Sequence, residues 1–372
     1  MQSLNDLNMF PTTYDLVVER INAINPIKYA KTRNFIIGDV TYLSPYLSRG
    51  VISVQQIKEA VLQKGFKPYE IEKFLQELAW REYYQRVWQV KKELIFSDLK
   101  QPQPDCLHDQ MPTAINTAST GIETIDAHIN TFYKTGYLHN HIRMYLASMV
   151  CNNAKAHWLA PATWMYYHLL DGDLASNCCS WQWVAGSFSS KKYYCNQENI
   201  NKYTHSTQRH TALDVSYEQL PSVALEAELI DLSMRFSGVS ENTLAINKEQ
   251  NSCIYTPFNI DPLWHPEENY QRILFWDLEF WNQHPVSIAV FNWINDLGKA
   301  NLKNLQIFVG RIEELSNMLD VKKACCKEHP STSTYPFQLE QRSWLLPEPG
   351  QIPVSFFPYW KKVQRQLQKN YQ

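Results

Sequence analysis

Hydrophobic positions follow a helical period through most of the first 200 residues. Between Pro68 and Leu94, apolar residues such as Ile71, Leu75 and Leu78 recur every three or four positions. This period is typical of a helix that buries one face. The same period predicts helices at residues 121–133, 137–155, 163–170 and 173–184.

The pattern changes after about His210. Residues 211–265 are rich in asparagine and weakly periodic, so we expect them to form a mixed connecting segment. Further on, strand–helix–strand–helix order is typical of a parallel α/β unit. The predicted strands are 273–277 and 305–309, the predicted helices are 285–297 and 312–319, and a basic helix follows at 361–369.

These patterns predict a mainly α fold, in which an all-helical domain is followed by a small α/β module. The chain has 372 residues, which at about 150 residues per domain suggests two or three domains. Only 11 glycines agrees with helices, because they need few tight turns. The predicted division is 1–210, 211–265 and 266–372.

Charge and composition exclude several classes. The 35 basic and 37 acidic residues nearly cancel, so nucleic-acid binding would need a local positive patch. No segment approaches the roughly 20 apolar residues of a membrane span, and residues 1–16 lack the features of a signal peptide. We therefore expect a cytoplasmic protein that does not contact a membrane.

Cysteine spacing predicts free thiols and no metal site. The eight cysteines include two adjacent pairs, Cys178–Cys179 and Cys325–Cys326, but no CxxC motif, which common zinc and redox sites require. The chain also lacks GxGxxG, GxxxxGK[ST], HExxH and GxSxG, which disfavours a nucleotide bound by a Rossmann fingerprint.

Two segments near the N-terminus carry candidate chemistry. Thr41 and Ser44 flank a turn where hydroxyls and N–H groups can hold a phosphate, although, taken alone, an ordinary helix cap explains them better. Glu77, Trp80 and Arg81 fall at i, i+3 and i+4 and share one helical face. That face is either a binding site or a solvated surface on which the indole packs.

Two later segments also place polar residues at helical spacing. Asn140 and Arg143 share one stripe, and Asp173 and Asn177 are four positions apart. Arg143 and Asp171 could pair in the interior, which would satisfy both charges. Taken singly, each of these residues could instead fill the core.

These segments contain five recognisable strings: YxxxRNF (29–35), LSPYLxxG (43–50), ELxWREYY (77–84), HNxxRM (139–144) and the highly specific DGDLASNxxSWQW (171–183). Together, they resemble the photolyase/cryptochrome family, specifically its helical FAD-binding domain. The resemblance covers roughly residues 10–205, and the order and separation of the strings match the family.

The resemblance implies FAD bound in a U shape. It assigns the phosphates and ribityl chain to Tyr29, Thr41, Leu43 and Ser44, although Val40 stands where the family usually has a hydroxyl residue. An amide near flavin N5 and cations near N1 stabilise the anionic reduced ring. The implied flavin-lining residues are Arg81, Asn140, Arg143, Asp171, Asp173 and Asn177, the last of which faces N5.

The implied activity is the repair of cyclobutane pyrimidine dimers. Such enzymes flip the dimer out of the DNA and pass it an electron from photoexcited reduced flavin. Glu77 would stabilise the resulting radical anion, whereas the string His139–Asn140–His141 does not give the histidine pair expected for (6-4) lesions. The implied dimer contacts are Glu77, Trp80, Asn140, Met144 and Trp183.

In the family, a tryptophan relay carries electrons to the flavin. Trp181 matches its proximal member and Trp158 its middle member, but the distal position falls near Asp105. The relay is therefore either shortened or completed by another aromatic residue. The candidates are Trp164, Tyr166 and Tyr167.

The C-terminal half departs from the family, whose members usually begin with an α/β domain that holds an antenna pigment. Residues 266–372 are either a permuted, trimmed counterpart or an unrelated module that binds a protein partner. An antenna pigment is therefore possible but not supported. The iron–sulfur branch is disfavoured because Cys178, Cys179 and Cys195 do not supply four suitably spaced thiolates.

Three hypotheses follow from these residues. The first is a photolyase, a lyase acting on single- or double-stranded damaged DNA, with Arg33, Lys191 and Lys192 contacting the backbone. The second is a cryptochrome-like blue-light receptor without repair activity. The third is a flavoprotein with structural or dark-redox FAD. The five retained dimer-contact residues favour the first, and the near-neutral charge favours the second.

Overall fold

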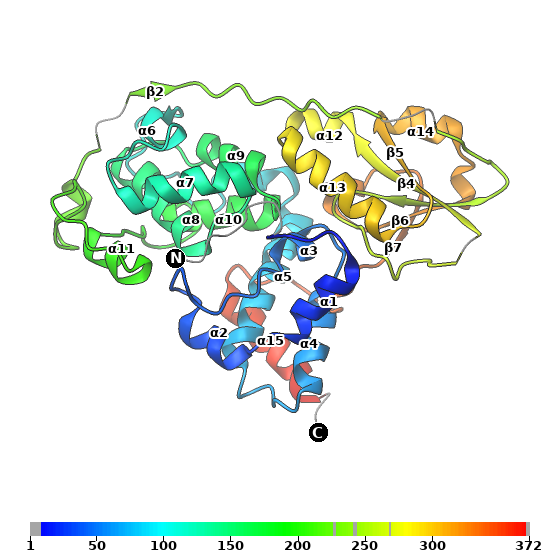
Figure 1. Ribbon diagram of the computed structural model, residues 1–372, viewed down its shortest axis with the longest axis horizontal. Helices are drawn as coiled ribbons and strands as arrows, with labels where there is room; N and C mark the ends of the chain where they lie inside the picture. The colour runs from blue at the N-terminus through cyan, green and yellow to red at the C-terminus, as the bar shows by residue number, and fades with distance from the viewer. Residues whose placement is uncertain (1–8, 226–227, 241–243, 268, 370–372) are drawn as a thin grey trace. The chain divides into compact units, whose positions relative to one another are not determined.

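The computed structural model describes residues 9–225, 228–240, 244–267 and 269–369 (Figure 1). The chain forms two compact units. Unit 1 contains the residues up to Ile27, Thr41–Gln89 and those from Arg235 onwards, and unit 2 contains Lys28–Val40 and Val90–Met234. These units differ from the predicted division at 210 and 266, because unit 1 assembles three stretches from both halves of the chain.

Unit 2 is mainly helical, and the helices expected there are confirmed with shifted ends. Helix α8 continues into a π-helical turn, Ser148–Asn153, and a two-stranded antiparallel pair joins β1 (Met111–Pro112) to β2 (Leu229–Ile230). The helices are α6 (Thr113–Asn116), α7 (Glu123–Thr135), α8 (Asn140–Ala147), α9 (Leu159–His168), α10 (Leu174–Ala185) and α11 (Gln197–Thr204), and α2 (Pro26–Thr32) begins at the unit boundary.

Helix ends in unit 2 follow from local sequence. Asp173 caps α10 by accepting a hydrogen bond from the Ser176 N–H, at 2.7 Å. Gly136 ends α7 with φ of +64°, a conformation that suits glycine, and a Cβ there would meet Leu170 at 2.7 Å. A larger residue at this position would therefore be strained and also displace the chain that leads to α10.

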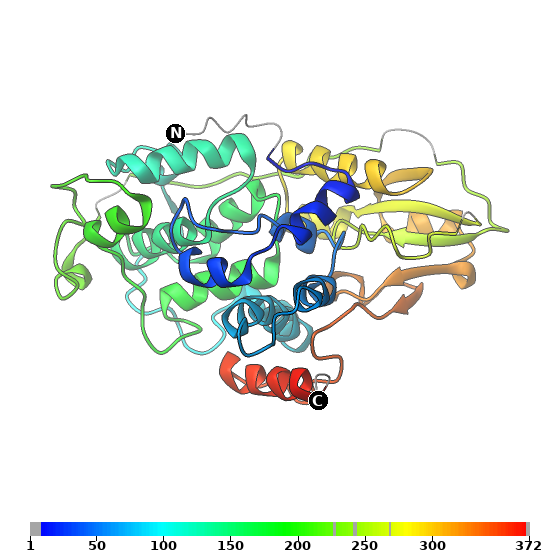
Figure 2. The ribbon, with the colours of Figure 1, turned by 60° about the horizontal axis from the view of Figure 1, so that its bottom comes forward.

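The helical part of unit 1 is built around α5, which spans Glu72–Lys91 as its apolar spacing predicts. The basic C-terminal helix is also confirmed, but it begins earlier than expected, as α15 (Phe356–Lys369). Figure 2 shows α15, in red, beside the blue α5. The other helices here are α1 (Tyr14–Asn22), α3 (Ser44–Ser48) and α4 (Val54–Gln63).

The rest of unit 1 is a parallel five-stranded sheet of order β5-β4-β3-β6-β7. The predicted strands and helices are present, but β3 comes from the segment expected to be only a connection. Its central place in the sheet explains why an expected boundary near 266 divides the α/β module. The strands are β3 (Asn251–Tyr255), β4 (Tyr270–Asp277), β5 (Leu305–Gly310), β6 (Ala324–Lys327) and β7 (Gln338–Glu340); the helices are α12 (Leu278–Gln283), α13 (Ile288–Asn301) and α14 (Ile312–Met318).

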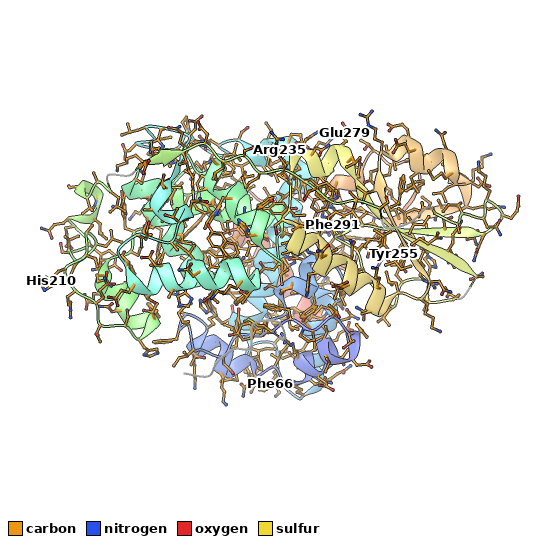
Figure 3. The ribbon with its side chains drawn as sticks, turned by 45° about the horizontal axis from the view of Figure 1, so that its top comes forward. Phe66, His210, Arg235, Tyr255, Glu279 and Phe291 are labelled. Carbon is orange, nitrogen blue, oxygen red and sulfur yellow. The ribbon has the colours of Figure 1, made fainter. Side chains whose placement is uncertain are left out.

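Both faces of the sheet are covered by helices. Successive strand residues point to opposite sides, so neighbouring residues of β4 pack on different faces. Phe275 packs in a core with Leu315 of α14. On the other side, the Trp276 indole lies at a tilt against the ring of Phe291 of α13, labelled in Figure 3, and donates a hydrogen bond to Asn295 at 2.9 Å. A parallel sheet buried on both faces explains the nearly continuous apolar run of β4.

Glu82 joins α5 to the C-terminal segment of unit 1. Its buried carboxylate accepts hydrogen bonds from the backbone N–H groups of Leu345 and Leu346 and from the Tyr359 hydroxyl on α15. Burial raises the pKa of Glu82, and these three hydrogen bonds oppose that increase. The carboxylate thus provides acceptors for donors that are themselves removed from water.

In the described part of the chain, no helix has the length and apolar character needed to cross a membrane. All eight cysteines are free, as predicted, and seven of them are buried.

We predict that Glu82→Ala will lower the free energy of unfolding by about 3–5 kcal/mol, because three buried donors lose their acceptor. Glu82→Gln should have a smaller effect, since its carbonyl can still accept. Denaturant unfolding followed by circular dichroism measures both. The exposed Glu59→Ala on α4 is the control and should change stability by no more than about 0.5 kcal/mol. Equal stabilities for Glu82→Ala and the control would contradict this role.

Candidate flavin site

Two of the predicted site residues in unit 2, Arg143 and Asp171, form an ion pair. Arg143 on α8 donates from its NH2 group to both carboxylate oxygens of Asp171, at 3.0 and 2.8 Å, and its Nε–H donates to the Leu138 carbonyl at 2.8 Å. The Asp171 side chain is 5% exposed and that of Arg143 is 23% exposed. The pair predicted from the sequence is confirmed, and it fixes a guanidinium at the margin of the core.

The first turn of α10 carries the next group of predicted residues. Asp173 is used as the helix cap, and Asn177 donates from Nδ2 to the Ala162 carbonyl of α9 at 2.8 Å. Because the Asn177 Nδ2 group makes this hydrogen bond, it is the side-chain carbonyl oxygen that can accept a hydrogen bond from a ligand. Ser176 Oγ is buried and has no hydrogen-bond partner among the described residues. The first turn of α10 therefore presents an amide oxygen and a hydroxyl group that can bind a polar ligand.

Asn140 and Met144 lie one turn apart on α8, with the Asn140 amide 3.8 Å from the Met144 sulfur. Asn140 is exposed and Met144 is half-buried, so both are accessible within unit 2. The neighbouring His139 is buried; its burial, together with the charges of His141 and Arg143, lowers its pKa to about 4. His139 is consequently neutral at physiological pH, which makes it a poor proton donor.

The two predicted relay tryptophans are in the core of unit 2. Trp158 is fully buried and Trp181 is 3% exposed. The Trp158 indole donates from Nε1 to Asp98 at 2.8 Å, a contact that the sequence did not suggest. Among the candidates for a distal member, Trp164 is buried and donates to the Tyr133 hydroxyl at 3.0 Å, whereas Tyr167 is half-buried.

The predicted DNA-backbone residues differ in their surroundings. Lys191 is exposed, and Arg33 is half-buried. Lys192 forms an ion pair with Asp105 at 3.0 Å, and its side chain is only 10% exposed. Asp105 therefore competes with a phosphate for this ammonium group, so the expectation that Lys192 serves as a surface cation is weakened.

Glu77, Trp80 and Arg81 lie on one face of α5 in unit 1. Glu77 pairs with Lys73 at 3.1 Å, and Arg81 donates to the Ser48 hydroxyl at 3.1 Å and to the Leu47 carbonyl at 3.3 Å. These contacts join α5 to α3. The Glu77 side chain remains 26% exposed, so it is accessible for a further contact.

The indole of Trp80 is stacked on Phe356 of α15. The ring centroids are 3.7 Å apart and the planes differ by 11°. Phe356 is 2% exposed, whereas Trp80 is half-buried. Phe356 thus covers one face of the indole and fixes its plane. No local pattern predicts this contact, because the two residues are distant in sequence.

The remaining predicted residues give less support for a phosphate site. α3 begins at Ser44 and has only five residues, and its cap residue Leu43 makes no side-chain capping bond. The Thr41 hydroxyl accepts a hydrogen bond from the Leu43 N–H at 3.4 Å, as in a local turn. Tyr29 is half-buried on α2 and belongs to unit 2. The structure thus brings together two sets, one in each unit.

Comparison with known proteins identifies the helical region. Residues 74–214 match the family described as "FAD binding domain of DNA photolyase". Curated relatives include the deoxyribodipyrimidine photo-lyases of Alkalihalophilus pseudofirmus, 30% identical over 42% of this chain and 34% of the relative, and of Streptomyces griseus, 31% identical over 43% and 35%. A solved cryptochrome of Synechocystis sp. PCC6803 is 24% identical, with a TM-score of 0.48 over 52% of this chain and 44% of its own.

Residues 74–214 therefore belong to the photolyase/cryptochrome family, as the sequence strings predicted. Their match to the FAD-binding domain of photolyases confirms FAD as the predicted cofactor. The alignments with the two curated relatives cover about a third of the length of each relative. The residues of α10 fit such a cofactor, because the Asn177 carbonyl and the Ser176 hydroxyl are available for a polar ligand.

We predict that Asp171→Asn will reduce both stability and FAD content. The change leaves the partly buried Arg143 without its counter-charge, at a cost of about 2–4 kcal/mol. Denaturant unfolding gives the stability, and flavin absorbance per chain gives the FAD content. Asp109→Asn at an exposed position of the same unit is the control and should leave both values unchanged. Wild-type values for Asp171→Asn would rule out a role for the pair.

Proposed function

We propose that this protein repairs cyclobutane pyrimidine dimers in DNA by light-driven electron transfer from reduced FAD. The observation that carries the proposal is the retention of all five dimer-contact types at the positions that resemble those of photolyases. They lie within or beside strings of the matched region: Glu77, Trp80, Asn140, Met144 and Trp183.

The residues proposed to bind FAD are found in each of the two units. Unit 1 contributes Thr41, Leu43, Ser44 and Arg81, and the remaining residues come from unit 2. When bound, FAD supplies the electron that splits the dimer and takes it back afterwards. The unit 2 residues are Tyr29, Asn140, Arg143, Asp171, Asp173 and Asn177.

Asn177 is proposed to orient the flavin through its amide carbonyl. Its Nδ2 group already donates to Ala162, which fixes the direction of the amide. In reduced flavin, N5 carries a hydrogen and therefore needs an acceptor. A carbonyl at that position matches this requirement, and the Arg143 guanidinium supplies positive charge for an anionic ring.

We predict that Asn177→Asp will change which flavin redox state survives in air. A carboxylate would place a negative charge beside an anionic ring and so disfavour the reduced form. Absorbance spectra during reoxidation measure the effect, and faster loss of reduced flavin is expected. Asn130→Asp, at an exposed position on α7, is the charge-matched control. Identical reoxidation of wild type and Asn177→Asp would contradict the assigned position.

Trp181 and Trp158 are proposed to carry electrons to the flavin. Both indoles are buried, so a charge on either one is little solvated by water. The Asp98 carboxylate, 2.8 Å from Trp158 Nε1, stabilises a positive charge on that indole. This hydrogen bond supports Trp158 as an electron donor that is transiently oxidised.

Substrate recognition is proposed to use stacking and one carboxyl group. A flipped pyrimidine dimer loses its stacking in DNA, and indole faces replace part of it. Phe356 covers one face of the half-buried Trp80 indole, and a base is proposed to stack on its other face. Glu77 is accessible on the same helical face and can form a hydrogen bond to a pyrimidine edge.

The repair proposal is tested by illuminating the reduced protein with an oligothymidine that carries a dimer. We expect restoration of thymine in blue light and none in the dark. Glu77→Gln should lower the repair yield about tenfold or more, because an amide cannot donate a proton to the dimer as a carboxyl group can. Its FAD content should be unchanged. The exposed Glu93→Gln variant is the matched control, and absence of repair by protein with bound, reduced FAD would refute the proposal.

The second candidate is a cryptochrome-like receptor, favoured by the Lys192–Asp105 ion pair and by the net charge of −2. Both features reduce the positive charge available to DNA. A receptor should show blue-light absorption changes without repair, and it should bind a dimer-containing strand no better than an undamaged one. A protein partner would then be expected at the C-terminal part of the chain.

A further inference from the structure

Two buried thiols face each other in the parallel sheet of unit 1. β3 and β6 are adjacent, and their register pairs Cys253 with Cys325, so both side chains point to the same face. Their sulfur atoms are 3.9 Å apart. Cys253 is fully buried and Cys325 is 7% exposed. Tyr255, labelled in Figure 3, lies two residues further along β3 on this face.

A histidine approaches the thiols from the loop that follows β3. Ligand atoms of Cys253, Cys325 and His265 all lie within 4.8 Å of one another. His265 has a φ of +46°, an uncommon backbone conformation for a residue other than glycine. Its carbonyl accepts a hydrogen bond from the buried Arg272 guanidinium at 2.8 Å, which holds the loop in this position.

The separation of the two sulfur atoms fits a tetrahedral metal centre. Two thiolates bound to zinc at about 2.3 Å with tetrahedral angles have sulfur atoms about 3.8 Å apart. The 3.9 Å separation matches that value. A disulfide would require the sulfurs to approach to about 2.05 Å. The two thiols are therefore already spaced for a shared ion.

Groups around the cluster support the same interpretation. Glu340 on β7 lies 2.9 Å from His265 Nε2 and accepts a hydrogen bond from Trp264 Nε1 at 2.7 Å. A carboxylate that orients the imidazole is a common partner of metal-bound histidine. With a divalent ion, two thiolates give a neutral centre.

We propose that Cys253, Cys325 and His265 bind Zn²⁺, with Glu340 positioning the imidazole. Thiolate and imidazole ligands suit this ion better than Mg²⁺ or Ca²⁺. The site lies in the α/β part of unit 1, outside the residues matched to the FAD-binding domain. It joins three strands and one loop, so its metal stabilises the sheet independently of any photochemistry. The sequence has no CxxC motif, and from this we predicted no metal site. Local spacing could not indicate this site, because its ligands come from distant segments.

The first test is elemental analysis of the full chain, purified without chelators and supplied with zinc. We expect about one zinc per chain and a large loss of zinc in Cys325→Ser and His265→Asn. The matched control is Cys326→Ser, which alters the next thiol on β6. Because Cys326 packs in the hydrophobic core of the other sheet face, its variant should retain zinc when folded. Circular dichroism establishes folding for every variant.

A second measurement does not depend on the stability of the variants. Replacing zinc by Co²⁺ in the wild-type chain should give thiolate-to-cobalt charge-transfer absorption and the intense bands of a tetrahedral centre. Absence of stoichiometric zinc and of these bands would overturn the proposal. So would equal zinc content in wild type and folded Cys325→Ser, or a disulfide between Cys253 and Cys325 in freshly purified protein.

Discussion

Much of unit 1 depends on one requirement: the buried Glu82 carboxylate must accept three hydrogen bonds. A carboxylate in this buried position requires donors, and Leu345, Leu346 and Tyr359 provide them. The same helix carries Trp80 two residues earlier, where Phe356 covers one face of the indole. The docking of α15 therefore also determines the orientation of a residue proposed to contact substrate.

Charge pairing organises unit 2 in a comparable way, with a different consequence. Arg143 and Asp171 fix the position of a cation beside the α10 cap, where an anionic ligand would benefit from it. Lys192 and Asp105 form a pair near the surface, and there the acidic partner reduces the attraction for phosphate. One ion pair thus holds a cation at a position proposed to bind flavin, whereas the other lowers the positive charge of a residue proposed to contact DNA.

The sequence predicted features that depend on local periodicity and on recognisable strings. The helix around Leu75, the strand around Phe275 and the Arg143–Asp171 pair are examples, since each follows from spacing or charge complementarity. β3 was missed because only five residues form it, within a polar and asparagine-rich stretch. The stack of Phe356 on Trp80 and the juxtaposition of Cys253 with Cys325 depend on tertiary folding, which local spacing does not encode. The roles of the individual flavin and DNA residues remain predictions.

Unit 1 is built from stretches that are far apart in the chain, and this affects where the chain can be truncated. A chain ending near residue 210 would retain most of the region matched to the FAD-binding domain, yet it would remove all three donors to Glu82 and the ring that covers Trp80. The first half therefore does not contain all the information for its own folding. Deletions and fusions that treat residues 235–369 as a detachable module would expose apolar and charged surface on α5, so this protein is a poor subject for modular recombination.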